Sequence, residues 1–249
     1  MHYERPIVMS IAGFDPSGGA GMLADIKTFE QHQCLGMGVV TAWTVQTEHT
    51  FQKVEWLSLE KIKEQAKLLL DEYAVPVIKI GIIESLEVLL ALVVWLKEQI
   101  RNIRIIWDTV LSASTGFLLT DAGNTDLLKS VLNHVFLITP NVQEARLLSG
   151  MDDEEEAAKQ LAHNCNVLLK GGHSEVSLGT DRLFTAQKEI QLLPSKENLY
   201  PKHGSGCILS AAIASHLARG VSLASACEKA KAYIETILGS NQNLLAYHV

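Results

Sequence analysis

The chain has 249 residues, of which 47% are hydrophobic and 20% charged, and this composition is typical of a folded domain with a large core rather than of a disordered chain. A net charge of −7 argues against nucleic acid as a partner, and the most apolar stretch, Val88–Leu96, is too short to span a membrane. The scattered Cys34, Cys165, Cys207 and Cys227 match neither a zinc site nor a disulfide framework. We therefore expect one cytoplasmic domain covering residues 1–249.

Short apolar runs alternate with segments of helical periodicity along most of the chain. The expected elements are a strand at Ile7–Ala12, a helix at about Ala20–Gln33, a strand at Met37–Val45, a helix at Leu59–Tyr73, a strand at Val77–Gly81, a helix at Leu86–Gln99, and strands at Ile103–Trp107, Val135–Asn141 and Asn166–Lys170. This alternation predicts an α/β fold with a mainly parallel central sheet between layers of helices.

The pattern changes after Gly172. Leu183–Ala186 and Glu189–Leu193 alternate between apolar and polar residues, which predicts antiparallel strands at one edge of the sheet. Two helices, at Gly206–Arg219 and Leu223–Leu238, are expected to close the domain.

Polar residues stand at or just after the carboxyl ends of the expected strands. They are Gln46, Asp108, Asn141, Glu144 and Lys170. Because ligands of open α/β sheets bind beyond these strand ends, five such residues predict a site there. Asp108 and Glu144 are candidate ligands of Mg²⁺, and Lys170 is a candidate partner of a nucleotide phosphate.

Two glycine-rich turns precede helices. The first, Gly13–Gly21, is neither a Walker A loop nor a dinucleotide fingerprint, but it provides a tight backbone, with Asp15 and Asp25 as candidate hydrogen-bonding groups for a ligand at the top of the sheet. In the second, Gly204, Ser205 and Gly206 precede or open a helix, whose free N–H groups would bind an anion. Cys207 stands at this helix start, where the dipole should lower its thiol pKa, and it is the candidate base for an acceptor hydroxyl.

These parts together are the inventory of a phosphoryl-transfer site. The chain also resembles the ribokinase-like kinases, and most closely the hydroxymethylpyrimidine/phosphomethylpyrimidine kinases of thiamin synthesis. The segments that carry the resemblance cover nearly the whole chain in order: Ile11-Ala-Gly-Phe-Asp-Pro-Ser-Gly-Gly-Ala-Gly, Ala24-Asp-Ile-Lys-Thr, Val40-Thr-Ala-Trp-Thr-Val-Gln, Lys79-Ile-Gly, Thr139-Pro-Asn-x-x-Glu-Ala, Lys170-Gly-Gly-His and His203-Gly-Ser-Gly-Cys.

The resemblance implies a three-layer ribokinase-like fold, a homodimer, ATP as co-substrate and Mg²⁺. It implies that Gly13, Asp25, Gln46 and Ile82 surround the pyrimidine, that Asn141, Lys170 and Gly172 bind ATP, and that Asp108 and Glu144 serve the metal. It also implies that Gly204, Ser205 and Gly206 form the anion hole, with Cys207 where sugar kinases of this fold use an aspartate base.

Three positions depart from the family pattern. Thr109 stands where a proline is usual, Ser114 where a lysine is frequent, and Ile82 where a methionine is usual. A pyridoxal kinase of the same subfamily is the nearest alternative, although the lid cysteine of that branch falls near Ala113, where there is no thiol. A second alternative is a non-catalytic binding protein on the kinase scaffold.

Overall fold

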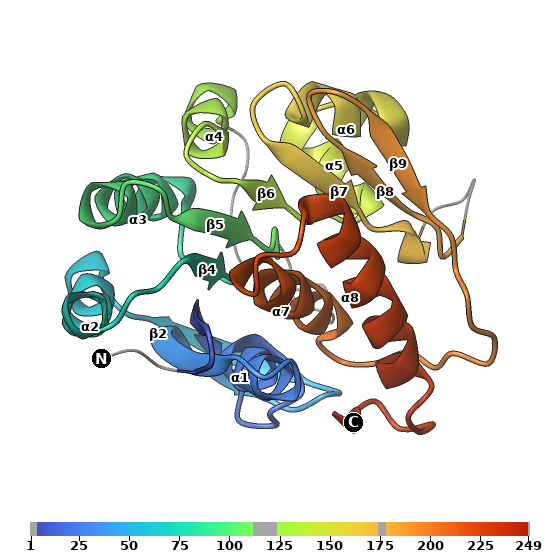
Figure 1. Cartoon of the computed structure of the whole chain (residues 1–249), viewed down its shortest axis with the longest axis horizontal. Coiled ribbons are helices and arrows are strands. Elements are labelled where there is room, and N and C mark those ends of the chain that lie inside the picture. The colour runs from blue at the N-terminus through green and yellow to red at the C-terminus, as the bar shows by residue number, and fades with distance from the viewer. Residues whose placement is uncertain (1–3, 112–123, 174–177, 249) are drawn as a thin grey trace.

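The described strands all join one sheet. The computed structural model describes residues 4–111, 124–173 and 178–248, and within them the strand order is β3-β2-β1-β4-β5-β6-β7-β8-β9 (Figure 1). The strands are β1 (Ile7–Phe14), β2 (Leu35–Gln46), β3 (Phe51–Trp56), β4 (Val77–Ile80), β5 (Arg104–Trp107), β6 (Leu137–Ile138), β7 (Asn166–Leu169), β8 (Asp181–Phe184) and β9 (Glu189–Leu192). Neighbouring strands from β2 to β7 are parallel, whereas β3, β8 and β9 are antiparallel additions at the two edges.

Helices cover both faces of the sheet. One face carries α1 (Gly21–Gln31), α7 (Ser205–Ala218) and α8 (Leu223–Leu238). The other carries α2 (Leu59–Glu72), α3 (Leu86–Gln99), α4 (Thr125–Leu132), α5 (Val142–Ser149) and α6 (Glu154–Leu161), and a short 3-10 turn, η1 (Gly171–His173), follows β7. The expected three-layer α/β/α fold is therefore confirmed.

The central strands are apolar on both faces because helices bury both faces. In β1, for example, Met9 and Ile11 belong to the core under α2–α6, while Val8 belongs to the core under α1, α7 and α8. Helix α7 is buried along nearly its whole length and is rich in Ala and Ser, whose small side chains allow close packing between the sheet and α8. No helix in the described residues is long and apolar enough to cross a membrane.

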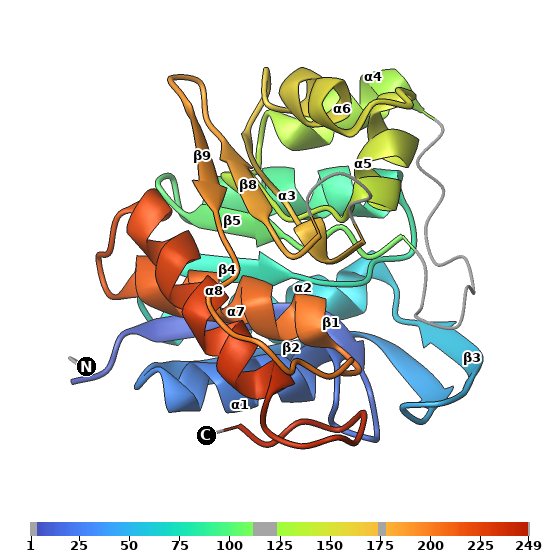
Figure 2. The same ribbon diagram turned by 90° about the vertical axis from the view of Figure 1, so that its right-hand side faces the viewer.

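Most expected elements are present with boundaries shifted by one to a few residues. The edge strand β3 was not predicted, although Phe51, Val54 and Trp56 are strand-favouring residues. It pairs with the end of β2 to form a two-stranded ribbon (residues 42–56) that projects from one edge of the sheet (Figure 2). The sequence also did not delimit helices α4, α5 and α6.

The sheet reverses its order of connection between β1 and β4. The chain leaves β1 through α1 to β2 on one side, whereas β4 leads through α3 to β5 on the other. Such a switch point opens a crevice beyond the carboxyl ends of the two strands. The last residues of β1 and β4, and the loops that follow them, therefore lie where a ligand is expected.

Candidate active site

A row of polar side chains crosses five adjacent strands on the α7 face of the sheet. In each strand an apolar residue of the α7-side core is followed two residues later by a polar one, which lies within β1 and β4 but just past the ends of β5, β6 and β7. Residues two apart along an extended chain share a face. The polar row, in sheet order, is Ser10, Lys79, Asp108, Thr139 and Lys170, preceded by Val8, Val77, Ile106, Leu137 and Leu168. Register confirms the arrangement, because Ser10 lies directly beside Lys79.

Lys79 is fully buried and forms an ion pair with Asp25 of α1. Its ammonium lies 3.0 Å and 2.9 Å from the two Asp25 oxygens and 3.7 Å from Asp108 Oδ2, and Ser10 Oγ donates to Asp25 Oδ2 at 2.5 Å. Burial by itself lowers the pKa of Lys79, but the carboxylates outweigh it and raise that pKa above its ordinary value. Asp25, expected beside the pyrimidine, thus lies beneath the site with both oxygens engaged.

Asp108 is the most highly bonded member of the row. Thr139 Oγ1 and Lys170 Nζ lie 3.0 Å and 3.3 Å from Oδ1, and Ser210 Oγ of α7 donates to Oδ2 at 3.1 Å. Burial works to raise the pKa of Asp108, but Lys170 and Lys79 hold it below its ordinary value. Asp108 is therefore an anion held between two lysines.

Glu144 meets the same lysine from the other side. Asn141 and Glu144 form a capping box at the start of α5, in which Glu144 Oε2 accepts from the Asn141 backbone N–H at 2.8 Å. The same oxygen accepts from Thr109 Oγ1 at 3.2 Å and lies 3.8 Å from Lys170 Nζ. Burial raises the pKa of Glu144, with Lys170 opposing it. Thr109, the departure from the family's proline, thus contributes a hydroxyl that orients Glu144.

The donor set fits a magnesium ion held partly by phosphate. Two carboxylates, Asp108 and Glu144, converge on the single ammonium of Lys170. Among the described residues, no group of three or more His, Cys, Asp or Glu side chains forms a metal cage. Mg²⁺ typically takes one or two protein carboxylates and completes its shell with water and nucleotide phosphate, so the absence of such a cage is compatible with it.

The helices that begin at the two glycine-rich turns differ from the others at their N-termini. A Ser, Asn or Asp side chain caps each of α2–α6 and α8, whereas α1 and α7 have no side-chain cap. The Ser205 N–H donates to the Lys202 carbonyl at 3.4 Å, and the N–H groups that follow it in the first turn of α7 are available to an anion. A Cβ placed on Gly206 would lie 3.2 Å from Lys170 Nζ, so an anion there would also meet this ammonium.

Gly204 allows α7 to start where it does. Its φ of +71° favours glycine, and a Cβ at this position would collide with the Gly19 carbonyl oxygen and lie 2.6 Å from Ala20 Cα. The two glycine-rich turns are thus packed backbone to backbone. Ser205 and Gly206 form the half-buried first residues of α7 beside this contact.

Cys207 lies in the first turn of α7, as expected, but its predicted acidity was wrong. Burial raises the pKa of its thiol to about 12, and the Lys79 ammonium opposes this only in part. The helix-dipole argument assumed a partly exposed sulfur, whereas Cys207 is buried near the carboxylates of Asp108 and Asp25, which also disfavour a thiolate. The backbone N–H of Gly21 hydrogen-bonds to the sulfur and links Cys207 to the first glycine-rich turn.

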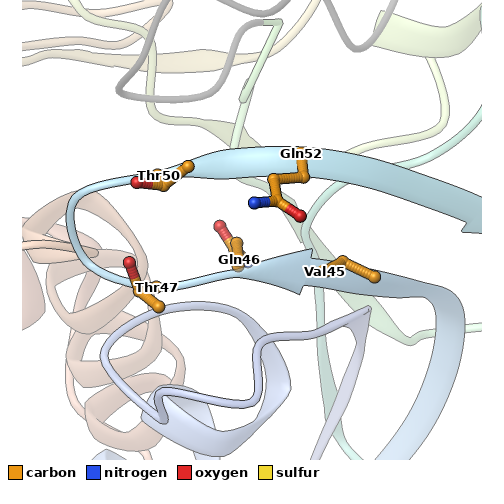
Figure 3. A pocket seen from close by; sticks show the side chains of 5 residues that line it. All are labelled: Val45, Gln46, Thr47, Thr50 and Gln52. Carbon is orange, nitrogen blue, oxygen red and sulfur yellow. The ribbon is translucent and has the colours of Figure 1, made fainter.

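The residues expected around the heterocycle lie at the ends of β1, β2 and β4. The Ile82 side chain covers Gly13 so closely that a Cβ on Gly13 would collide with it. Gln46 donates to Thr44 Oγ1 at 2.9 Å, and Thr44 in turn donates to the Phe14 carbonyl. Gln46 also lines a cavity of about 100 Å³ in the β2–β3 ribbon with Val45, Thr47, Thr50 and Gln52, where Gln46 and Gln52 point toward one another (Figure 3).

Other expected positions are less informative. Gly172 is exposed in η1, and a Cβ there would meet nothing within 4 Å. Ala113 and Ser114, which concern the lid, lie outside the described residues. Sequence reasoning missed Ser10, Lys79 and Thr139, although a polar residue two positions after a buried apolar one in a strand was a usable signal.

The fold and this constellation define a ribokinase-like phosphotransferase. Residues 15–249 match the family model described as phosphomethylpyrimidine kinase, and the chain belongs to this family. It is 35% identical to a hydroxymethylpyrimidine/phosphomethylpyrimidine kinase of Rhizobium meliloti (strain 1021) over 96% of this chain and 92% of that protein. It is 33% identical to the protein of that name from Escherichia coli (strain K12) over 98% and 95%.

Solved structures agree with the fold. The chain is similar to pyridoxal kinase from Staphylococcus aureus in complex with ADP, with a TM-score of 0.84, 27% identity and coverage of 98% of this chain and 93% of that chain. It is also similar to phosphomethylpyrimidine kinase from Clostridium difficile 630, with a TM-score of 0.78, 31% identity and coverage of 92% and 98%.

Proposed function

We propose that this protein is an ATP-dependent kinase of thiamin biosynthesis. It phosphorylates the hydroxymethyl group of 4-amino-5-hydroxymethyl-2-methylpyrimidine and then phosphorylates the resulting monophosphate. The observation that carries the chemistry is the uncapped N-terminus of α7 beside Lys170, because free N–H groups and an ammonium converge where a phosphoryl group is transferred. The names of the similar kinases support the substrate.

On the phosphate side, backbone N–H groups of Gly204, Ser205 and Gly206, at and just before the start of α7, hold the transferring phosphoryl group. Lys170 and Asn141 bind the ATP phosphates, and Gly172 lets the backbone approach the nucleotide. Lys170 is held between Asp108 and Glu144, and these two carboxylates outweigh burial to raise its pKa above its ordinary value, so it stays charged. A fixed positive charge needs little rearrangement as negative charge develops on the phosphoryl oxygens.

Asp108 and Glu144 are the residues that would hold Mg²⁺. When bound, the ion neutralises phosphate charge and orients the transferring group. Thr109 keeps Glu144 oriented, and the capping box ties Glu144 to the backbone of Asn141.

On the acceptor side, Gly13, Ile82 and Gln46 surround the pyrimidine. Gly13 and Ile82 supply a flat apolar contact, and Gln46 offers a donor and an acceptor to the edge of the heterocycle. We propose that Asp25 acts through Lys79, because both its oxygens are engaged below the surface.

Cys207 takes the proton of the acceptor hydroxyl. Burial raises the thiol pKa to about 12 even though the Lys79 ammonium opposes this, so the thiol is mostly protonated near neutral pH. Positioning of the hydroxyl contributes to the rate as well as the base, because little bonding to the nucleophile has developed in a loose phosphoryl-transfer transition state.

The decisive experiment compares hydroxymethylpyrimidine with pyridoxal as acceptors of phosphate from ATP, with products resolved by mass. We expect a monophosphate and then a diphosphate from the pyrimidine. Pyridoxal kinase activity is the second candidate, favoured by the TM-score of 0.84 to the Staphylococcus aureus pyridoxal kinase. Phosphate on pyridoxal alone would replace the pyrimidine assignment, and no product from either would leave a binding protein on the kinase scaffold.

We also propose that residues 1–249 act as one domain in a cytoplasmic homodimer. One sheet containing all described strands supports a single domain, and the free thiols of all four cysteines are compatible with a reducing compartment. Trp43 and Val45 are 49% and 53% exposed on the β2–β3 ribbon, which supports contact with a second copy. A monomeric mass in solution would contradict the dimer.

A further inference from the structure

A buried hydrogen bond between His203 and Asp15 joins the two glycine-rich turns, and neither residue belongs to the catalytic set described above. His203 Nε2 lies 2.9 Å from Asp15 Oδ2, and the two side chains are 7% and 1% exposed. Asp15 follows β1, whereas His203 directly precedes Gly204, 188 residues later. The pair therefore ties the turn beside the heterocycle to the start of α7.

Asp15 is held in place as an anion. Its carboxylate accepts from the Ser17 backbone N–H, from Ser17 Oγ and from the Ala20 backbone N–H, each at 2.8 to 2.9 Å. Burial works to raise the pKa of Asp15, but the His203 and Ser17 contacts outweigh it and keep that pKa below its ordinary value. Because Asp15 is an acceptor only, His203 donates to it from Nε2–H.

His203 is fixed from its other side as well. Its backbone N–H donates to the Leu244 carbonyl at 3.0 Å, and a Cβ on Gly19 would lie only 2.7 Å from both the His203 ring and the Leu245 side chain. Lys202 Nζ donates to the carbonyls of Asn241 and Asn243. The segment that leads into α7 is thus held between the first turn and the C-terminal residues (Figure 2).

The start of α7 has no side chain of its own to hold it. Gly204 carries none and α7 has no side-chain cap, so His203 is the last side chain before the free N–H groups. Among the described residues, the only hydrogen bond of the His203 ring is the one from Nε2 to Asp15, because Nδ1 is buried without a hydrogen-bond partner.

We infer that Asp15 and His203 are positioning residues that set the α7 N–H groups relative to the acceptor. The inference rests on the proposed function. Loss of the hydrogen bond between Asp15 and His203 should lower the rate of phosphoryl transfer but change the affinity for the heterocycle little. The reason is that the α7 N–H groups act on the transferring phosphoryl group, and a small displacement of these groups reduces their effect.

Two substitutions of His203 give a matched test. His203→Gln keeps a donor near the Nε2 position, whereas His203→Asn places its amide near Nδ1 and leaves Asp15 without this donor. Both variants lose the ring, so their losses of packing are similar. We expect kcat to fall at least about tenfold more in His203→Asn than in His203→Gln, with KM for the pyrimidine within about threefold of wild type in both.

Lys27→Met is the control for the first turn alone, because Lys27 Nζ holds the Gly18 carbonyl at 2.8 Å without touching α7. It should leave kcat within about threefold. Equal kcat in His203→Asn and His203→Gln, or a change confined to KM, would overturn the inference. If His203→Asn does not fold, Asp15→Asn replaces it, since its amide keeps the carboxylate's shape but loses the charge that binds His203, and an unchanged kcat there would overturn the inference too.

The outcome for the wild type separates the two claims. No phosphorylation by wild-type protein would remove the proposed function together with this inference. An active wild type with unchanged kcat in the replaced pair would remove the inference alone.

Discussion

Replacing Lys79 with methionine should be the most destabilising single change at the site. It removes the ammonium that contacts both oxygens of Asp25 and faces Asp108. In wild type, the three carboxylates of Asp25, Asp108 and Glu144 and the two ammonium groups of Lys79 and Lys170 give this cluster a net formal charge of −1. Lys79→Met changes the net charge to −2, and all the remaining charged groups are at least largely buried. Breaking a buried pair in this way costs about 3–5 kcal/mol, a large share of a typical stability of about 5–15 kcal/mol.

The double variant Lys79→Met/Asp25→Asn restores the net charge of −1. Asparagine at position 25 still accepts the Ser10 hydroxyl, which lies 2.5 Å from Asp25 Oδ2 in wild type. The double variant should therefore lose only about 2 kcal/mol, less than Lys79→Met alone. Lys79→Met and Asp25→Asn should be strongly non-additive, with a coupling energy of about 2 kcal/mol or more.

Urea unfolding of the wild type, the two single variants and the double variant measures this coupling. Lys67→Met is the control, because Lys67 pairs with Asp71 at the exposed surface of α2 and its loss should change stability by less than about 0.5 kcal/mol. Additive costs around the cycle, or a Lys79→Met loss no larger than that of Lys67→Met, would refute the claim that Lys79 and Asp25 are a mutually compensating ion pair.

Three further predictions concern the site. Because burial raises the pKa of Cys207 to about 12, the thiolate fraction increases about tenfold per pH unit below that pKa, and kcat/KM should therefore rise from pH 7 to pH 9. Cys207→Ser should lose most of the turnover and should no longer show this rise. A plateau of the wild-type kcat/KM below pH 9 would contradict the assignment of Cys207 as the base. Glu144→Gln should raise the Mg²⁺ concentration that gives half-maximal activity about tenfold or more. Thr109→Val should raise this concentration less, because the substitution removes only the hydroxyl bonded to Glu144. Unchanged magnesium titrations in both variants would contradict the role of Glu144. Gly204→Ala should lower the free energy of unfolding, measured by heat or urea, about 2 kcal/mol more than Gly150→Ala does. Gly150 has nearly the same φ as Gly204, but a Cβ there would have open space around it. Equal losses in the two variants would show that the contact of Gly204 with Gly19 is not tight.

The alternation of strands and helices, and with it the layered fold, could be derived from the sequence because periodicity and apolar runs are local properties. The same holds for the strand-end positions of Asp108 and Lys170, and for the capping residues Asn141 and Glu144, whose spacing of three is a local signal. The edge strand β3 escaped because its stability depends on pairing with β2, a tertiary contact.

What the sequence by itself determined was which chemical groups stand at the strand ends and helix starts. Only the tertiary structure decided their environment. Cys207 occupies the predicted place at the start of α7, yet burial outweighs the helix dipole and raises its pKa, and burial depends on the packing of α7 against the sheet. Lys79 and Asp25 are 54 residues apart, and Asp15 and His203 are 188 residues apart, so neither pair could be found from local spacing. Polar pairing over such separations is set by how the chain folds back on itself, because hydrogen bonds and electrostatic interactions depend on distance in space and on exclusion of water.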